Sequence, residues 1–163
     1  MRAILFLLFL ACLSPCRADP VPYKQLFAGF NGPRVTDTHF FTSVVAVRSS
    51  WLATAMPAQL EKVLSEVDFA HQMLVVSVVG EHGGATGQVK IVRIEVSREK
   101  RQTYGMAFVA IGVNGAGCKQ KYRRSYPFVV AVIEKEPNIQ SGGYDDQNFP
   151  DGCKPTISGT SHD

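Results

Sequence analysis

The sequence predicts a mainly β protein of the α+β class. We expect five or six strands in a single antiparallel sheet or a sandwich-like meander, with one helix near the N-terminus and one disulfide. Three observations carry this prediction: several short runs are rich in valine and isoleucine, glycine and proline separate them, and only one stretch has apolar residues at helical spacing. Short β-branched runs divided by turn residues are typical of sheets and sandwiches.

The chain begins with the pattern of a signal peptide. Arg2 precedes an unbroken apolar run from Ala3 to Leu13, and Cys16-Arg17-Ala18 places small residues three and one positions before a cut at Asp19. A transmembrane anchor is the alternative, but a helix of this length rises only about 16 Å, whereas the hydrocarbon core is about 30 Å thick. We therefore expect residues 1–18 to be removed and the protein to be exported, either periplasmic or secreted.

The rest of the chain is expected to be one domain that neither spans a membrane nor binds nucleic acid. No later stretch is apolar enough to span. A lipid anchor needs acylation of Cys12 or Cys16, and it is disfavoured because Pro15 directly precedes Cys16 and a cut at Cys12 halves the apolar run. Removing the two leader arginines lowers the formal net charge from +3 to +1, because 17 basic residues become 15 against 14 acidic ones. This balance favours no nucleic-acid partner.

The elements follow from the spacing of the apolar residues. Residues 19–40 are expected to be an irregular lead-in to a β domain over residues 41–136. Ser49 or Ser50 can cap the helix. Within Gln88–Val96 the apolar parity changes, which indicates a β-bulge near Val92. The expected elements are strands at Tyr23–Phe27, Phe41–Val47, Met73–Val79, Gln88–Val96, Tyr104–Val113 and Tyr126–Ile133, and a helix from Trp51 to Val67 interrupted by Pro57.

Two cysteines remain after the leader is removed, Cys118 in a loop and Cys153 in a tail over residues 137–163 that lacks periodicity. In an oxidising compartment two such cysteines most simply pair. We expect a Cys118–Cys153 disulfide that pins the tail and stabilises the fold by about 4 kcal/mol in the chain-entropy model. Two free thiols are the alternative.

A domain of this size is expected to have a single contiguous core. Phe108 is placed in it, so its truncation to alanine is expected to cost about 3–5 kcal/mol. The expected core residues are Trp51, Leu60, Leu64, Phe69, Val75, Val89, Ile94, Phe108 and Val130.

The chemistry of a secreted hydrolase is missing from the sequence. It contains neither G-x-S-x-G nor H-E-x-x-H. The histidines lack metal-ligand spacing, and the acidic residues from Asp145 to Asp151 do not fit the register of a calcium loop. We expect no catalytic residue, no metal and no cofactor.

Two loops are candidates for binding a partner. Gly80–Gly87 is glycine-rich and follows the most apolar strand, so it is the first candidate. Its competitor is the basic loop after Cys118, whose exposed charges predict salt-dependent binding. The candidate residues are Glu81, His82, Gly83, Gly84, Thr86 and Gly87 in the first loop, and Lys119, Lys121, Arg123 and Arg124 in the second.

Four segments together resemble the PrcB C-terminal domain family. The segments are Arg48-Ser49-Ser50-Trp51-Leu52, Val67-Asp68-Phe69-Ala70 followed by Met73 to Gly80, Gly83 to Gly87 followed by Val89 and Ile91, and Tyr126-Pro127-Phe128-Val129-Val130. The resemblance covers about residues 22–136. The sequence departs from the family pattern at Gln88, where the family has an aromatic residue, and in the two segments that carry the mature cysteines.

This resemblance implies an extracytoplasmic, mainly β module without catalytic residues. Such a module acts through contacts with another protein, and the family name implies an exported protease as the partner. We therefore expect a non-catalytic binding module that stabilises or chaperones such a protease. The alternative is an inhibitor that inserts Gly80–Gly87 into the cleft of a secreted hydrolase. That hydrolase is a protease or, on the four-residue similarity of Ser141–Tyr144 to the S-G-x-Y motif of lysozyme inhibitors, a lysozyme.

Overall fold

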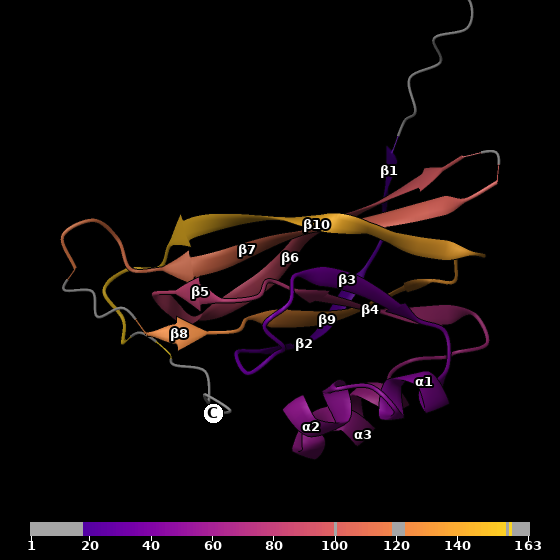
Figure 1. The fold of residues 1–163 in the computed structure, drawn as a ribbon, viewed down its shortest axis with the longest axis horizontal. Helices are drawn as coiled ribbons and strands as arrows, with labels where there is room; N and C mark the ends of the chain where they lie inside the picture. Colours follow the sequence, from indigo (N-terminus) through magenta and orange to yellow (C-terminus); the bar gives the residue numbers. More distant parts are fainter. Residues whose placement is uncertain (1–17, 100, 119–122, 156, 158–163) are drawn as a thin grey trace, which may run out of the picture.

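The computed structural model describes residues 18–99, 101–118, 123–155 and 157, which form three stacked layers. Two four-stranded sheets pack face to face, and three helices cover the outer side of one of them (Figure 1). We call the sheet β2-β9-β4-β3 the inner sheet and the sheet β1-β6-β7-β10 the outer sheet. The expected mainly β architecture with one helical region is confirmed, but the expected single sheet is wrong.

The inner sheet is entirely antiparallel, and its two central strands are apolar on both faces. Both faces are covered, one by the outer sheet and one by the helices, so neither strand needs a polar side. Its strands are β2 (Lys24–Gly29), β3 (Asp37–Phe41), β4 (Gln72–Val78) and β9 (Phe128–Glu134).

The outer sheet is covered on one face only. β6 and β7 form a long hairpin with a register shift between Ile91 and Arg93, which confirms the β-bulge expected near Val92. β10 pairs with β7 in parallel, so the sheet is mixed rather than a meander. Its strands are β1 (Ala18–Val21), β6 (Ala85–Arg98), β7 (Thr103–Val113) and β10 (Ile139–Pro150), and a two-stranded sheet joins β5 (His82–Gly83) to β8 (Arg124–Ser125).

The helical layer corrects the sequence prediction for Phe41–Val47, whose second half is helical. Ser43 begins the first helix, because its hydroxyl oxygen accepts a hydrogen bond from the Ala46 amide at 3.2 Å. Val47 then lies fully buried against the inner sheet, so tertiary packing overrides the strand preference of the valines. The helices are α1 (Val44–Arg48), α2 (Leu52–Ala55) and α3 (Pro57–Ser65).

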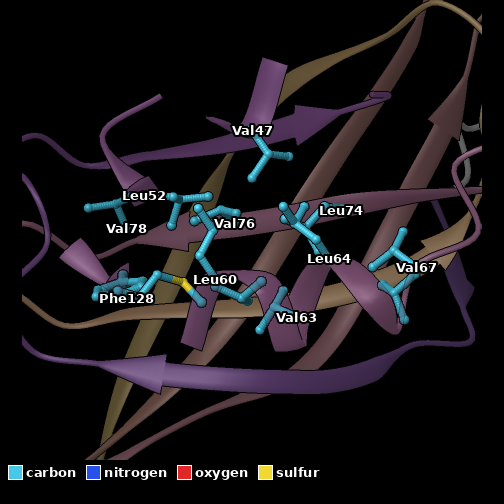
Figure 2. Close-up of a cluster of buried hydrophobic side chains, with 13 residues drawn as sticks. Val47, Leu52, Leu60, Val63, Leu64, Val67, Leu74, Val76, Val78 and Phe128 are labelled. Atoms are coloured by element: carbon cyan, nitrogen blue, oxygen red, sulfur yellow. The ribbon is translucent and has the colours of Figure 1, made fainter. Parts of the chain in front are cut away.

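The core consists of two clusters, not one. The first lies between the helices and the inner sheet and includes Leu60, Leu64 and Val130 (Figure 2). The second lies between the two sheets and includes Val75, Val89 and Ile94. Trp51 and Phe69 pack against the first cluster. Phe108 belongs to neither cluster, because it projects from the uncovered face of the outer sheet.

Two segments expected to be irregular contain strands. The lead-in, residues 19–40, carries β2, most of β1 and the first part of β3. The tail after Pro137 carries β10, which is twelve residues long. Both β1 and β10 are edge strands with largely exposed side chains. Edge strands of this kind lack the apolar alternation by which a strand is recognised in a sequence.

The free edge of β6 is covered by three different segments. β1 pairs with Ile94–Ser97. Further back along β6, Gln25 of β2 accepts a hydrogen bond from the Ile91 amide at 3.0 Å, and the Tyr23 hydroxyl donates to the Ile91 carbonyl at 2.9 Å. At the start of β6 the Ile157 amide donates to the Ala85 carbonyl at 2.7 Å. These contacts satisfy main-chain groups that otherwise attract another strand.

Candidate functional site

The structure brings the two candidate loops together at one end of the molecule. His82 pairs with Ser125 and Gly83 pairs with Arg124, so Gly80–Gly87 and the described part of the basic loop form one surface. The Arg124 guanidinium also lies 3.4 Å from the Glu81 carboxylate. Arg123 is exposed beside this surface, while Lys119 and Lys121 lie outside the described residues. The candidates expected to compete are therefore neighbours.

Gly80–Gly87 is held along its length. His82 Nε2 lies 2.8 Å from Asn148 Oδ1, and the Ser125 hydroxyl donates to the His82 carbonyl at 3.0 Å. Thr86 is buried, and its hydroxyl donates to the Asp151 carboxylate at 2.7 Å. Gly84 is the exception, because it has a φ of +80° and no atom within 4 Å of the position that a Cβ would take. The segment is a pinned corner with one open residue.

The predicted disulfide is present at the same end. Cys118 and Cys153 are bonded, with their Cα atoms 5.4 Å apart. Main-chain bonds hold the tail there as well, since the Gly115 amide donates to the Gly152 carbonyl at 3.2 Å and the Lys154 amide donates to Asn114 Oδ1 at 2.7 Å. The bridge thus reinforces a contact that also has its own hydrogen bonds.

Asp151 links the tail to this corner. Its carboxylate accepts hydrogen bonds from the Lys154 ammonium and from the Thr86 hydroxyl, each at 2.7 Å. The hydrogen bond from Lys154, and secondly that from Thr86, holds the pKa of Asp151 below its usual range. The anion that fastens the tail is therefore present throughout the neutral and mildly acidic range.

Two polar clusters resemble parts of a catalytic site but lack its order. The Ser141 hydroxyl donates to Asp37 at 2.7 Å, and Asp37 lies 3.8 Å from His39 Nδ1. The aspartate is in the middle, whereas a serine nucleophile needs the histidine beside it. His71 and Asp68 form an exposed pair at 2.8 Å. In residues 18–99, 101–118, 123–155 and 157, no three His, Cys, Asp or Glu side chains are placed to hold a metal ion, and no helix is long and apolar enough to cross a membrane.

The most extended candidate surface is the uncovered face of the outer sheet, which we call the outer face. Met106, Phe108 and Ala110 project from β7 along its middle, because alternate residues of a strand point to the same side. Val92, which is 41% exposed, and Phe149 widen this apolar row. Polar and charged residues flank it on both sides, namely Lys90, Arg93 and Glu95 on β6 and Asp145 and Gln147 on β10.

Basic side chains lie on the aromatic rings of the outer face. The Arg93 guanidinium carbon is 3.6 Å from the centre of the Phe108 ring, and the Lys90 ammonium is 4.8 Å from the centre of the Phe149 ring. Arg93 also pairs with Glu95 at 2.7 Å. Between the rings, an open cavity of about 420 Å³ has Ala110 among its lining residues. Small, aromatic and charged groups thus alternate across the face.

A second cavity, which we call the β1 cavity, opens at the other end of the outer face and has a volume of about 480 Å³. Residues from all four strands line it. They are Ala18 of β1, Glu95 and Ser97 of β6 with Glu99 beyond its end, Tyr104, Gly105 and Met106 of β7, and Ser141 and Gly142 of β10. Small residues from three of the four strands leave room above the sheet, because large side chains there would fill the space.

Sequence reasoning overlooked the outer face, although one signal pointed to it. Tyr104–Val113 has apolar residues at both parities, as expected of a strand covered on both faces. In the structure its outward residues Met106 and Phe108 have no covering layer among the described residues. The excess apolar side is the feature that identifies a contact surface. Comparison of this chain with protein-family models, curated proteins and solved structures gives no match.

Proposed function

We propose that this chain is an exported, non-catalytic module that binds another protein through the outer face. The observation that carries the proposal is the apolar row of Met106, Phe108 and Ala110 inside a charged rim. Protein interfaces have this anatomy, with aromatic residues, methionine and arginine enriched at an apolar centre and charges at the edge. The export pattern at the N-terminus places the contact outside the cytoplasm.

The strand edges give less support to a contact by strand addition. Side chains of β2 and the tail already satisfy the edge of β6. The free edge of β10 carries the consecutive residues Asp145 and Asp146 and ends at Pro150, and both features oppose pairing with another strand. A partner therefore has a flat face available to it rather than an open edge.

An exported protease is the partner class that we propose, and this part of the proposal rests on the resemblance to the PrcB C-terminal domain family. The alternative, an inhibitor that inserts Gly80–Gly87 into a cleft, has less support because Thr86 is buried and His82 is tied to β8 and β10. The similarity of Ser141–Tyr144 to lysozyme inhibitors has little support too, because the segment is part of β10 and Ser141 bonds to Asp37.

The test is a binding comparison of surface variants of the mature protein with a partner captured from the exported fraction of the source cells. Phe108→Glu places a charge in the centre of the outer face and is expected to weaken binding at least tenfold, which is about 1.4 kcal/mol. Val45→Glu is the matched control, because Val45 is 74% exposed on α1 in the opposite layer. Circular dichroism checks the fold of each variant.

The competing site is tested in the same assay. Replacing Gly83 and Gly84 by alanine alters the corner instead of the outer face. If this double variant loses the partner while Phe108→Glu keeps it, the corner is the contact surface and the outer face is not.

A further inference from the structure

The predicted cleavage site lies inside a strand of the fold. β1 begins at Ala18, and the expected cut separates Ala18 from Asp19. In the uncut chain Ala18 lies opposite Ser97 of β6 and lines the β1 cavity. Cleavage therefore removes one residue from the cavity wall and leaves a new chain end in its place.

The chemistry of the cut fixes what that chain end is. Hydrolysis by a leader peptidase adds one water molecule across the Ala18–Asp19 peptide bond. The hydroxyl group goes to the Ala18 carbonyl carbon, which leaves as a carboxylate on the leader. The Asp19 nitrogen gains the hydrogen and is largely an ammonium at neutral pH, because an α-amino group has a pKa of about 7.7–8.0. This nitrogen was bonded directly to Ala18, so the positive charge arises at the edge of the β1 cavity.

Carboxylates are the nearest charged groups at this position. Glu95 lies opposite Pro20 and Ser97 lies opposite Ala18, so both line the cavity on either side of the new amino group. Glu99 lines the same cavity just beyond the end of β6.

The other charged and titratable groups around β1 are already engaged. The Asp19 carboxylate lies 3.8 Å from the Arg98 guanidinium, which also bonds to Glu136, and Glu95 pairs with Arg93 at 2.7 Å. The Tyr104 hydroxyl on β7 bonds to Gln102.

We propose that the α-ammonium group of Asp19 docks in the β1 cavity against Glu95 and Glu99, so that processing completes this end of the outer face. The geometry that carries the proposal is the position of Ala18 in the cavity wall. β1 is short and lies at an edge of the sheet, so a contact at its first residue helps to hold the whole strand. An unprocessed chain lacks this charge and keeps Ala18 in its place.

The first measurement identifies the chain end. N-terminal sequencing and the intact mass of the exported protein are expected to show Asp19 as the first residue. A different first residue overturns the proposal, which rests on the predicted export signal. Partner binding is not needed at any step, so the result is independent of the proposed function.

The second measurement concerns the amino group itself. We compare the mature protein with a free Asp19 amino group, the same chain acetylated at that nitrogen, and a chain that keeps Ala18 as its first residue. Acetylation removes the charge, and the added alanine moves the charge one residue outward. Both are expected to lower the melting temperature at pH 7. Equal melting temperatures for the free and acetylated chains overturn the docking.

The third measurement is the titration of the amino group by NMR. Neighbouring carboxylates favour the ammonium form, so its pKa is expected about one unit above the ordinary range. Glu95→Gln and Glu99→Gln are each expected to lower that pKa. Glu61→Gln is the matched control, because Glu61 is exposed on α3 and pairs with Arg48. A pKa in the ordinary range, or one that responds equally to Glu61→Gln, contradicts the proposal.

Discussion

Two phenylalanines illustrate how the position of a single residue decides its contribution to stability. Phe128 is fully buried, with its ring centre 5.0 Å from that of Trp51 and 5.8 Å from that of Phe27. Gly29 belongs to the same contact, because a Cβ there would be only 2.3 Å from the Phe128 ring. Phe108 is half-buried on the outer face, with Arg93 over its ring. Both residues occur in apolar strand segments, and only the layers around them differ.

We therefore expect the two alanine variants to differ in free energy of unfolding. Phe128→Ala leaves a cavity between the helices and the inner sheet and is expected to cost about 3–5 kcal/mol. Phe108→Ala removes a ring that water already reaches and is expected to cost about 1 kcal/mol. Urea unfolding followed by circular dichroism measures both values. Equal costs for the two variants contradict the placement of Phe108 outside the core.

At the scale of an element, β6 shows how an exposed edge is protected by side chains from another sheet. Gln25 of β2 uses both ends of its amide, accepting from the Ile91 amide at 3.0 Å and donating to the Val89 carbonyl at 3.4 Å. This is the hydrogen-bonding pattern of a neighbouring strand, supplied by one side chain. The register of β2 against β9 determines where that side chain lies.

Changing Gln25 is expected to open this edge. Gln25→Ala leaves both main-chain groups of β6 without their partner and is expected to cost about 1–3 kcal/mol. Gln25→Glu is the matched control, because a carboxylate still accepts from the Ile91 amide but cannot donate to Val89. Hydrogen exchange at the Ile91 amide is expected to accelerate in the alanine variant and to stay slow in the glutamate variant. Unchanged protection in both variants contradicts this account of the edge.

The whole molecule is closed at one end by the disulfide. Cys118 and Cys153 are separated by 35 residues, and the intervening chain contains β8, β9 and β10. The bridge therefore joins the end of the outer sheet to a segment that also contributes a central strand to the inner sheet. β10 has a second attachment, its parallel pairing with β7 along most of its length.

Removing the bridge is expected to weaken the fold without releasing β10. Replacing both cysteines by serine is expected to lower the free energy of unfolding by about 4 kcal/mol, because the unfolded chain loses a constraint. Hydrogen exchange of the β10 amides is expected to remain slow in the folded variant, since their partners on β7 are intact. Chemical denaturation and exchange measure the two effects, and fast exchange throughout β10 would show that the bridge alone holds the strand.

The sequence by itself determined the features that depend on neighbouring residues. The strands β4, β6, β7 and β9, the turn between β6 and β7 and the bulge at Val92 agree with the pattern of apolar and turn residues, because local backbone preference and parity specify them. The Cys118–Cys153 disulfide was predictable for a different reason, since two cysteines have a single way to pair.

Only the tertiary structure decided how those pieces are divided and what remains exposed. The split into two sheets, the parallel pairing of β10 and the helical form of Val44–Arg48 depend on contacts between residues far apart in the chain. The outer face belongs to this group, because the sequence shows that Met106 and Phe108 are apolar but not which layer covers them. An apolar residue becomes core or contact surface according to what packs against it, and that is a property of the whole fold.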